Sequence, residues 1–169
     1  FFGEEINSKL ISRKIVKERK CKKILTEDLV NIINKTKKKF TKTNKATKIF
    51  QALRIIVNNE ISELISGLSK SCNLISKNGV IVTITFHSIE DRICKFFFNN
   101  ISSIKKVSRY FPVNSDDNIF FELINKKPII PSLKEIEKNP PSRSAKLRAI
   151  KRKENNKVDT KFVYEKFKN

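Results

Sequence analysis

The sequence has few glycines, and no two of them lie close together. Only three are present, at positions 3, 67 and 79. A loop that cradles a phosphate or a dinucleotide needs closely spaced glycines, because backbone N–H groups must approach the ligand. We therefore expect no cofactor-binding loop of this type within these residues.

Methionine is absent, and position 1 is Phe. Phe is too bulky to follow an initiator Met that is removed in the ordinary way, so we expect that the chain is not a complete translation product. The three cysteines, at positions 21, 72 and 94, form no C-x-x-C pair. This pattern predicts neither a disulfide framework nor a zinc or other metal site, and it favours a reducing, cytoplasmic setting.

Long apolar runs are also missing, since none approaches the roughly 18 residues of a membrane-spanning helix. Basic residues, in contrast, are abundant: 37 Lys and Arg stand against 17 Asp and Glu, which gives a net charge of +20. A chain this basic is expected to bind a polyanion, either nucleic acid or an acidic membrane surface. Hydrophobic residues make up 38% of the chain, and this content argues against disorder.

The positive charge is concentrated in two flanks. Residues 9–48 carry a net charge of +12 and residues 141–169 carry +7, whereas residues 49–140 carry only +3. Lysines (29) outnumber arginines (8), which favours diffuse attraction to phosphate over two-bond contacts. The run from Lys35 to Lys48 is either a solvated linker or part of an RNA-binding surface.

Helical periodicity is clearest between residues 50 and 68, where apolar residues recur at three- and four-residue steps. Another helix is expected over residues 5–20. A third is expected from Thr26, which can cap it, with Glu27 and Asp28 at its positive end. The apolar positions of the clearest helix are Phe50, Leu53, Val57, Ile61, Leu64 and Leu68.

Residues 80–86 are β-branched and almost continuously apolar. Such a run is typical of a central parallel strand that is covered on both faces. Alternation of this strand with helices predicts an α/β fold. The other expected elements are a helix over 89–98, strands over 119–125 and 146–151, a short helix with a capping box at Ser132 and Glu135, and a basic tail from 154.

Four segments follow one another in this order: residues 2–5 (FGEE); 46–55 (ATKIFQALRI) with Val57, Asn58 and Glu60; 86–92 (FHSIEDR); and 139–140 (NP) with 142–148 (SRSAKLR). Together they resemble the RsmH (MraW) family of ribosomal RNA small subunit methyltransferases, over about residues 2–152. The family uses S-adenosylmethionine to methylate N4 of a cytosine in 16S rRNA, so the resemblance implies that activity and the small ribosomal subunit as partner.

The resemblance also implies a fold, a Rossmann-like class I methyltransferase with an inserted helical domain. Residues 1–45 would be the rear part of the insertion, 46–153 the C-terminal half of the core, and 154–169 a basic tail. The family's glycine-rich S-adenosylmethionine loop would precede residue 1. This agrees with the scarcity of glycine and implies that no cofactor-binding residue lies in this chain.

The segment 86–92 follows the predicted buried strand, and ligands of open α/β sheets bind at the carboxyl ends of strands. The lone pair of cytosine N4 is delocalised into the ring, so an enzyme must hold the base, align N4 and accept a proton. The base must also leave its stack. His87 and Glu90 are therefore the candidate catalytic residues, each as a proton acceptor or as a hydrogen-bonding partner of the base edge.

Several polar residues of these segments are candidates for binding substrate or RNA, each beside a structural alternative. Ser88 also fits a helix-capping box with Asp91. Arg92 either reaches a phosphate or pairs with a neighbouring acid. Gln51 and Arg54 either contact substrate, lie on a solvated face or pin the inserted domain to the core. The basic candidates near the C-terminus are Arg143, Lys146 and Arg148, because Arg can hold phosphate with two bonds.

Two other functions are compatible with the composition. A non-catalytic, basic RNA- or ribosome-binding module, acting as a subunit that complements an N-terminal partner, is the main alternative to the enzyme. A protein that binds acidic membranes is the weaker one, and salt-sensitive binding to RNA in preference to anionic vesicles would argue against it.

Overall fold

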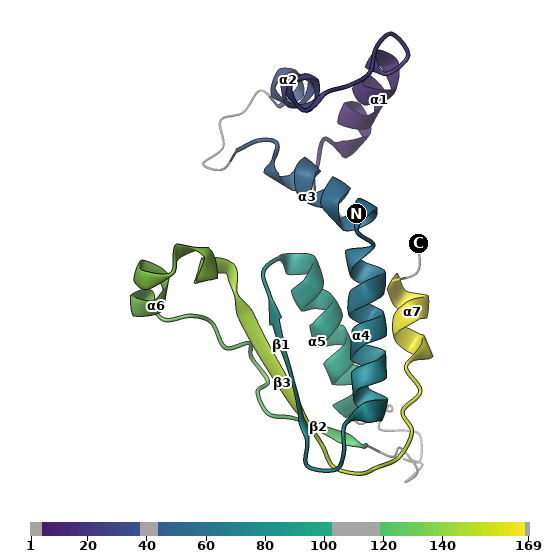
Figure 1. Ribbon diagram of the computed structural model, residues 1–169, viewed down its shortest axis with the longest axis vertical. Helices are drawn as coiled ribbons and strands as arrows, with labels where there is room; N and C mark the ends of the chain where they lie inside the picture. Colours follow the sequence, from purple (N-terminus) through teal and green to yellow (C-terminus); the bar gives the residue numbers. More distant parts are fainter. Residues whose placement is uncertain (1–4, 38–43, 103–118, 168–169) are drawn as a thin grey trace, which may run out of the picture. The chain divides into compact units, whose positions relative to one another are not determined.

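A computed structural model describes residues 5–37, 44–102 and 119–167 (Figure 1). The chain divides into two compact units, Phe1–Glu60 and Ile61–Asn169, and each is described by itself. Residues 2–4 of the first family segment, and residues 38–43 of the lysine-rich run, lie outside the described residues. The boundary expected near residue 45 stays a prediction about the inserted domain.

The described part of the N-terminal unit contains the helices α1 (Ser8–Glu18), α2 (Thr26–Thr36) and α3 (Thr47–Val57). The first two confirm the helices expected in these regions. The unit has its own small core, in which buried residues from all three helical segments meet. That core consists of Ile11, Leu29, Ile33 and Ala46, with the partly buried Ile15, Ile24, Val30, Ile49 and Phe50 packed against it.

Helix α2 is capped differently from the expectation. Its N-cap is Leu25, whose backbone N–H donates to Asp28 Oδ2 at 3.0 Å, and Thr26 is the first helical residue. The side chain of Leu25 cannot accept a hydrogen bond, so the capping contact at this end is the one that the carboxylate of Asp28 makes with the backbone N–H of Leu25. Glu27 and Asp28 do lie in the first turn of α2, as expected, but the N-cap is Leu25 and not Thr26.

The single helix expected over residues 50–68 is wrong, because the structure has two. Helix α3 ends at Val57, and α4 (Glu60–Leu74) begins three residues later. Asn59 between them has a φ of 52°, in the left-handed region. Asn adopts this region more readily than most residues, so a pair of asparagines can interrupt an apolar periodicity that otherwise continues.

The second unit is built on a small antiparallel sheet of β1 (Val80–Thr85), β2 (Phe121–Leu123) and β3 (Lys146–Arg152), in the order β1-β3-β2. Helix α5 (Ser88–Ser102) packs on one face of this sheet (Figure 1). The connection from β2 to β3 contains α6 (Leu133–Lys138) and the 3₁₀-helix η1 (Pro140–Ser144). These elements confirm the α/β class and the strands expected in all three places.

The core of this unit lies between α5 and the sheet. Register places Ile81 opposite Ile150, and both side chains are buried on the α5 side together with Phe121. Helix α5 contributes Phe97 and Phe98, each with at most 1% of its surface exposed. The phenylalanine run 96–98 therefore includes two core residues, as a helix with an apolar face requires.

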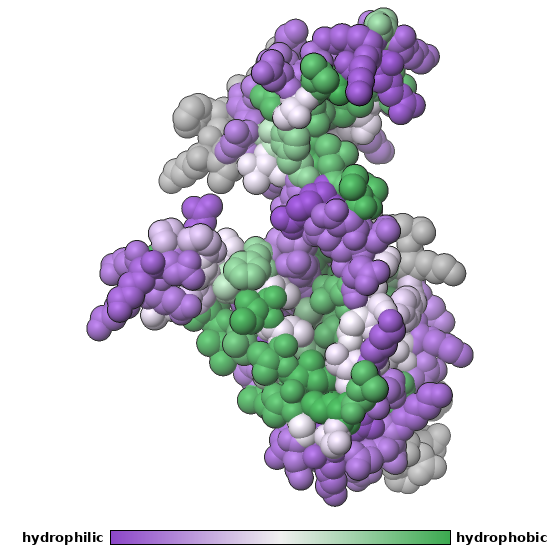
Figure 2. All heavy atoms as spheres, viewed as in Figure 1, coloured by the Kyte–Doolittle hydropathy of each residue, from purple (hydrophilic) through white to green (hydrophobic). Residues whose placement is uncertain are grey.

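The other face of the sheet is open and apolar. Val80, Val82 and Ile84 alternate with the inward residues of β1, and Ile84 is 58% exposed. Ile129, which pairs with Leu147 of β3, is 58% exposed as well. Figure 2 shows hydrophobic residues gathered over this sheet.

The expectation of a central parallel strand over residues 80–86 is thus wrong for the described part of the chain. There β1 pairs antiparallel with β3, lies at the sheet edge and is covered on one face only. The apolar residues that prompted the expectation are present, but those on one face lack a covering layer among the described residues.

The tail beyond residue 153 is folded against the second unit. It contains α7 (Lys161–Phe167), whose Val163 is fully buried. The ring of Phe162 lies 5.9 Å from those of both Phe96 and Phe97. The side chain of Asn73 in α4 also bonds the backbone N–H and carbonyl of Val158. Residues 154–169 were expected to be a basic tail, but four lysines against three acids give them a net charge of only +1, and this part of the tail is a packed element.

Arg152 joins the end of β3 to the tail. This residue is 3% exposed, and its guanidinium donates to the carbonyls of Cys72 and Ile75 at the end of α4. It also donates to the carbonyls of Glu154 and Asn156. Since the last carbonyls of a helix lack intrahelical donors, one buried Arg both caps α4 and fixes the start of the tail. No helix among the described residues is long and apolar enough to cross a membrane.

Candidate active site at the end of the first strand

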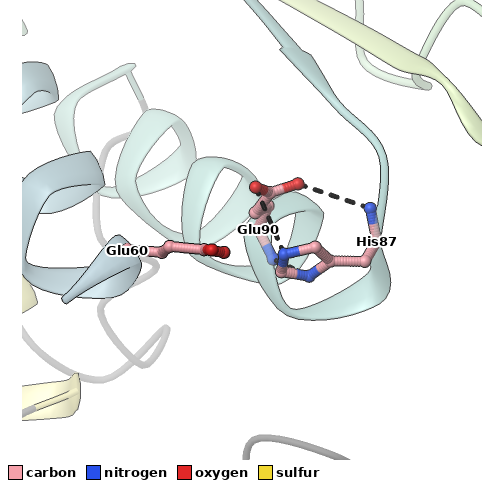
Figure 3. Close-up of side chains that lie close together, drawn as sticks. All are labelled: Glu60, His87 and Glu90. Atoms are coloured by element: carbon pink, nitrogen blue, oxygen red, sulfur yellow. Dashed lines mark hydrogen bonds and ion pairs between the residues drawn. The ribbon is translucent and has the colours of Figure 1, made fainter. Parts of the chain in front are cut away.

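His87 and Glu90 meet where β1 ends and α5 begins (Figure 3). Glu90 Oε2 accepts hydrogen bonds from the backbone N–H groups of Phe86 at 3.0 Å and His87 at 3.4 Å. In return, the backbone N–H of Glu90 donates to His87 Nδ1 at 3.4 Å. The two residues are therefore joined by reciprocal hydrogen bonds, which fix the carboxylate of Glu90 at the carboxyl end of β1.

These contacts form a capping box one residue earlier than expected. The sequence predicted Ser88 as the cap and Asp91 as the acid that reaches back. The structure instead has His87 in the cap position and Glu90 as the returning acid. Ser88 is the first residue of α5 and is exposed. The helix still begins with acidic residues near its positive end, as helix dipoles favour.

The hydrogen-bonding pattern fixes which nitrogen of His87 carries the proton. Nδ1 accepts from Glu90, so in the neutral ring the proton lies on Nε2. Nε2 lies 3.2 Å from Glu90 Oε1, but it is buried and has no hydrogen-bond partner among the described residues. The short separation is thus an electrostatic contact without hydrogen-bond geometry, and a buried donor remains unsatisfied beside the carboxylate.

Asp91 occupies the next position of α5 and connects the helix to β3. Its carboxylate accepts from Arg148 Nε at 2.7 Å and from Lys146 Nζ at 3.2 Å. Burial acts to raise the pKa of Asp91, but the hydrogen bonds and charges of Arg148 and Lys146 outweigh it and lower the pKa. The ionised carboxylate therefore locks the start of α5 to the sheet.

Lys146 and Arg148 were predicted as RNA-binding residues, and the structure shows how they are used within the chain. Arg148 is 7% exposed and donates from both Nε and Nη2 to Asp91. Lys146 keeps 40% of its side chain exposed while it contacts the same acid. A role in RNA binding stays a prediction for both, and their geometry supports it more for Lys146.

The remaining predicted residues are distributed over both units. Arg92 of α5 and Arg143 of η1 are exposed in the second unit. Gln51 and Arg54 lie on α3 in the N-terminal unit, where Arg54 holds Glu60 through Nε at 2.7 Å and Nη2 at 3.1 Å. Glu60, also drawn in Figure 3, is the last residue of that unit. Within the second unit, hydrogen bonds gather the predicted residues His87 and Glu90 in one place.

Sequence reasoning did not find the anchoring role of Asp91. A signal was present, because Lys146 and Arg148 are two residues apart on a strand and so project from the same face. Two cations on the inner face of a sheet need a buried acid nearby, since a buried charge is costly unless it is paired. The acid of the preceding helix could have been assigned to them on this argument.

The fold and the site define an α/β protein with an anchored carboxylate at the end of a strand, where many α/β enzymes bind their ligands. A family model, described as the MraW methylase family, matches residues 1–153. The chain belongs to this family, which confirms the resemblance found in the sequence. The family is one of methyltransferases.

Curated relatives support the same assignment. The chain is 43% identical over 155 residues to the "Ribosomal RNA small subunit methyltransferase H" of Sulfurihydrogenibium sp. (strain YO3AOP1), covering 89% of this chain and 48% of the relative. The protein of the same name from Borreliella afzelii (strain PKo) is 48% identical over 152 residues, covering 89% of this chain and 46% of the relative. The chain thus spans about half the length of the curated relatives it matches.

Proposed function

We propose that this chain takes part in the S-adenosylmethionine-dependent methylation of cytosine N4 in 16S rRNA. Family membership supports methyl transfer, and the names of the relatives support the RNA of the small ribosomal subunit as substrate. The observation that carries the proposal is the carboxylate of Glu90, held by two backbone N–H groups at the end of β1.

Glu90 has the chemistry that an amino group of a base requires. Cytosine N4 carries hydrogen-bond donors, and carboxylates accept from that group in protein–nucleic acid complexes. Oε2 is occupied by the backbone, whereas Oε1 is directed toward His87 and the side chain remains 27% exposed. We assign to Oε1 the hydrogen bond from N4 and the acceptance of its proton during or after methyl transfer.

His87 acts in this proposal by positioning Glu90. Its side chain is 11% exposed, and its Nδ1 and backbone N–H both contact Glu90. The Nε2–H stands 3.2 Å from Oε1 and stabilises the negative charge of the carboxylate. The pair keeps the acceptor fixed in position, and such preorganisation avoids a cost of rearrangement at the moment of reaction.

The cofactor is proposed to bind mainly outside these residues. The three glycines form no phosphate-cradling loop. The open apolar face of the sheet and the edge position of β1 support a larger sheet, because a Rossmann-like sheet is covered on both faces. In this proposal the rest of the methyltransferase covers Val82 and Ile84 and supplies S-adenosylmethionine, whose sulfonium methyl is the group transferred.

A chimera tests the activity. Residues 1–153 replace the matching part of the Sulfurihydrogenibium relative, and the purified protein is incubated with S-adenosylmethionine and unmethylated 30S subunits. We expect N4-methylcytidine in nuclease digests of the 16S rRNA, detected by mass spectrometry. The 169-residue chain alone is expected to give none. Methylation by that chain alone would refute the proposed location of the cofactor, and a folded but inactive chimera would refute the proposed function.

The role of Glu90 is tested in the same chimera. Glu90→Gln removes the proton acceptor and is expected to lower kcat by about 10²- to 10⁴-fold, the usual contribution of general base catalysis. Glu63→Gln, the same change at an exposed position of α4, serves as the control and should leave kcat unaltered. Equal rates for the two variants would show that Glu90 has only its capping role.

A further inference from the structure

A groove in the N-terminal unit is lined by residues that belong to none of the four family segments. It has a volume of about 470 Å³ and is formed by α1, the turn after it and α2. Buried Ile32 contributes to its floor, and exposed Cys21 lies in its wall. The other residues that line it are Lys14, Lys17, Glu18, Lys22 and Lys35.

The lining has one carboxylate against four ammonium groups. Lys22 also pairs with Asp28 at 2.5 Å, yet 55% of its side chain is exposed. Lys17 and Lys35 are exposed as well. Lysines can place their methylene stems along the wall while their charged ends stay in water, so the groove has an apolar floor and a cationic rim.

The positive charge around the groove indicates a polyanion as its binding partner. The surrounding residues 9–48 carry a net charge of +12, so the rim is part of a broad positive field. A small anion would need a built pocket of buried polar groups, whereas the phosphates of an RNA strand are held by several mobile lysines at once. We propose that the α1–α2 groove binds the ribose-phosphate backbone of ribosomal RNA. This inference rests on the proposed function for the identity of its RNA.

The groove contributes affinity and orientation in this arrangement, without reading sequence. Lysine contacts to phosphate position a nucleic acid and carry no base information directly. Recognition of the target base is left to the second unit. The N-terminal unit, which has its own core, thereby holds the RNA by electrostatic attraction.

Cys21 provides a direct probe of the groove. It is the one exposed cysteine, whereas burial raises the pKa of Cys72 to about 12 and that of Cys94 to about 11. A maleimide should therefore modify Cys21 selectively in the folded 169-residue chain, which peptide mass mapping verifies. Protein-free 16S rRNA is expected to slow this modification at least tenfold at low salt, and 0.5 M KCl should abolish the protection.

Substitution of the lysines gives a second, independent measurement. Lys14→Gln, Lys17→Gln and Lys35→Gln together should reduce the slope of log Kd against log salt by about 2, since each lost phosphate contact to single-stranded RNA accounts for about 0.7. The control variant carries Lys157→Gln, Lys161→Gln and Lys166→Gln, three exposed lysines of the tail. Circular dichroism verifies that both variants keep their helices.

The outcomes separate this inference from the proposed function. An equal slope change in both variants, or Cys21 that RNA leaves unprotected, would overturn the groove assignment even if the chimera methylates 16S rRNA. Protection by vesicles rich in phosphatidylglycerol but not by RNA would assign the groove to a membrane and also overturn it. If RNA protects Cys21 while the chimera is inactive, the groove assignment holds and the proposed activity fails.

Discussion

The two faces of the small sheet have opposite environments although the same strands form both. On one face, α5 covers Ile81, Ile150 and Phe121. On the other, Val82 and Ile84 are more than half exposed, with no covering layer among the described residues. The open face is the more apolar one in sequence, because β1 places Val80, Val82 and Ile84 there, whereas Thr83 and Thr85 share the covered face with Ile81. An apolar strand sequence therefore indicates that a face is buried, but it does not indicate what buries it. Only the structure shows which face is covered by elements of this chain.

The covered face should account for most of the stability of the second unit. Phe97→Ala removes a fully buried ring under the sheet and is expected to cost about 3–5 kcal/mol, from lost burial and the cavity that remains. Phe86→Ala, at a position that is 56% exposed, should change the free energy of unfolding by less than about 0.5 kcal/mol. Urea unfolding monitored by circular dichroism measures both, and similar costs would show that the faces do not differ.

The ion pairs between α5 and β3 should also contribute, with a dependence on pH. Asp91→Asn leaves Arg148 buried without its ionised partner and is expected to cost about 3 kcal/mol at pH 7. Lys146→Gln, at the more exposed partner, should cost less than about 1 kcal/mol. The matched pair separates the buried contact from the partly solvated one in the same urea experiment.

The sign of the pH effect follows from the lowered pKa of Asp91. An acid whose pKa is lower in the folded state binds its proton more weakly there than in the unfolded chain, where its value is about 3.8. Its stabilisation is therefore complete above about pH 5 and is lost as the pH falls through the lowered pKa. Asp91→Asn should flatten this part of the plot of unfolding free energy against pH. If the variant lost stability at acid pH as the original chain does, the role given to Asp91 would be contradicted.

The open face should show the smallest effect in the isolated chain. Ile84→Lys places a charge on an exposed position and is expected to change the free energy of unfolding by less than about 0.5 kcal/mol. In the chimera, where the remaining half is proposed to cover this face, the same change should prevent folding or methylation. Ile81→Lys, on the covered face, is the contrast and should be strongly destabilising in both proteins.

The sequence predicted where helices and strands occur better than it predicted how they pair and what covers them. The strand from Val80 and the helix that follows it were expected because residue type and local periodicity determine them. The pairing of β1 with β3, more than 60 residues away, depends on contacts that no local pattern encodes. The break at Asn59 was missed for a similar reason, since one left-handed residue interrupts a helix without altering the apolar spacing on either side.

For the candidate site, the sequence identified two residues that lie together, but it did not predict all of the contacts between them. His87 and Glu90 were both named from the family segment, and the structure shows them in contact. Their mutual capping was assigned instead to Ser88 and Asp91, because serine is a far commoner cap than histidine. The direction of an imidazole depends on the turn that enters the helix, and this geometry is absent from a residue pattern.

The attachment of the tail has a consequence for how freely its sequence can change. Arg152 and Asn73 contact carbonyl and N–H groups of Glu154, Asn156 and Val158 and none of their side chains. Every residue type offers a carbonyl, and every type except proline offers an N–H. Positions 154 and 156 can therefore diverge between related proteins while the chain keeps the same path toward α7, provided that the contacts of Arg152 are retained. Asn155 differs, because its side-chain Oδ1 accepts from the backbone N–H of Lys77 at 2.7 Å.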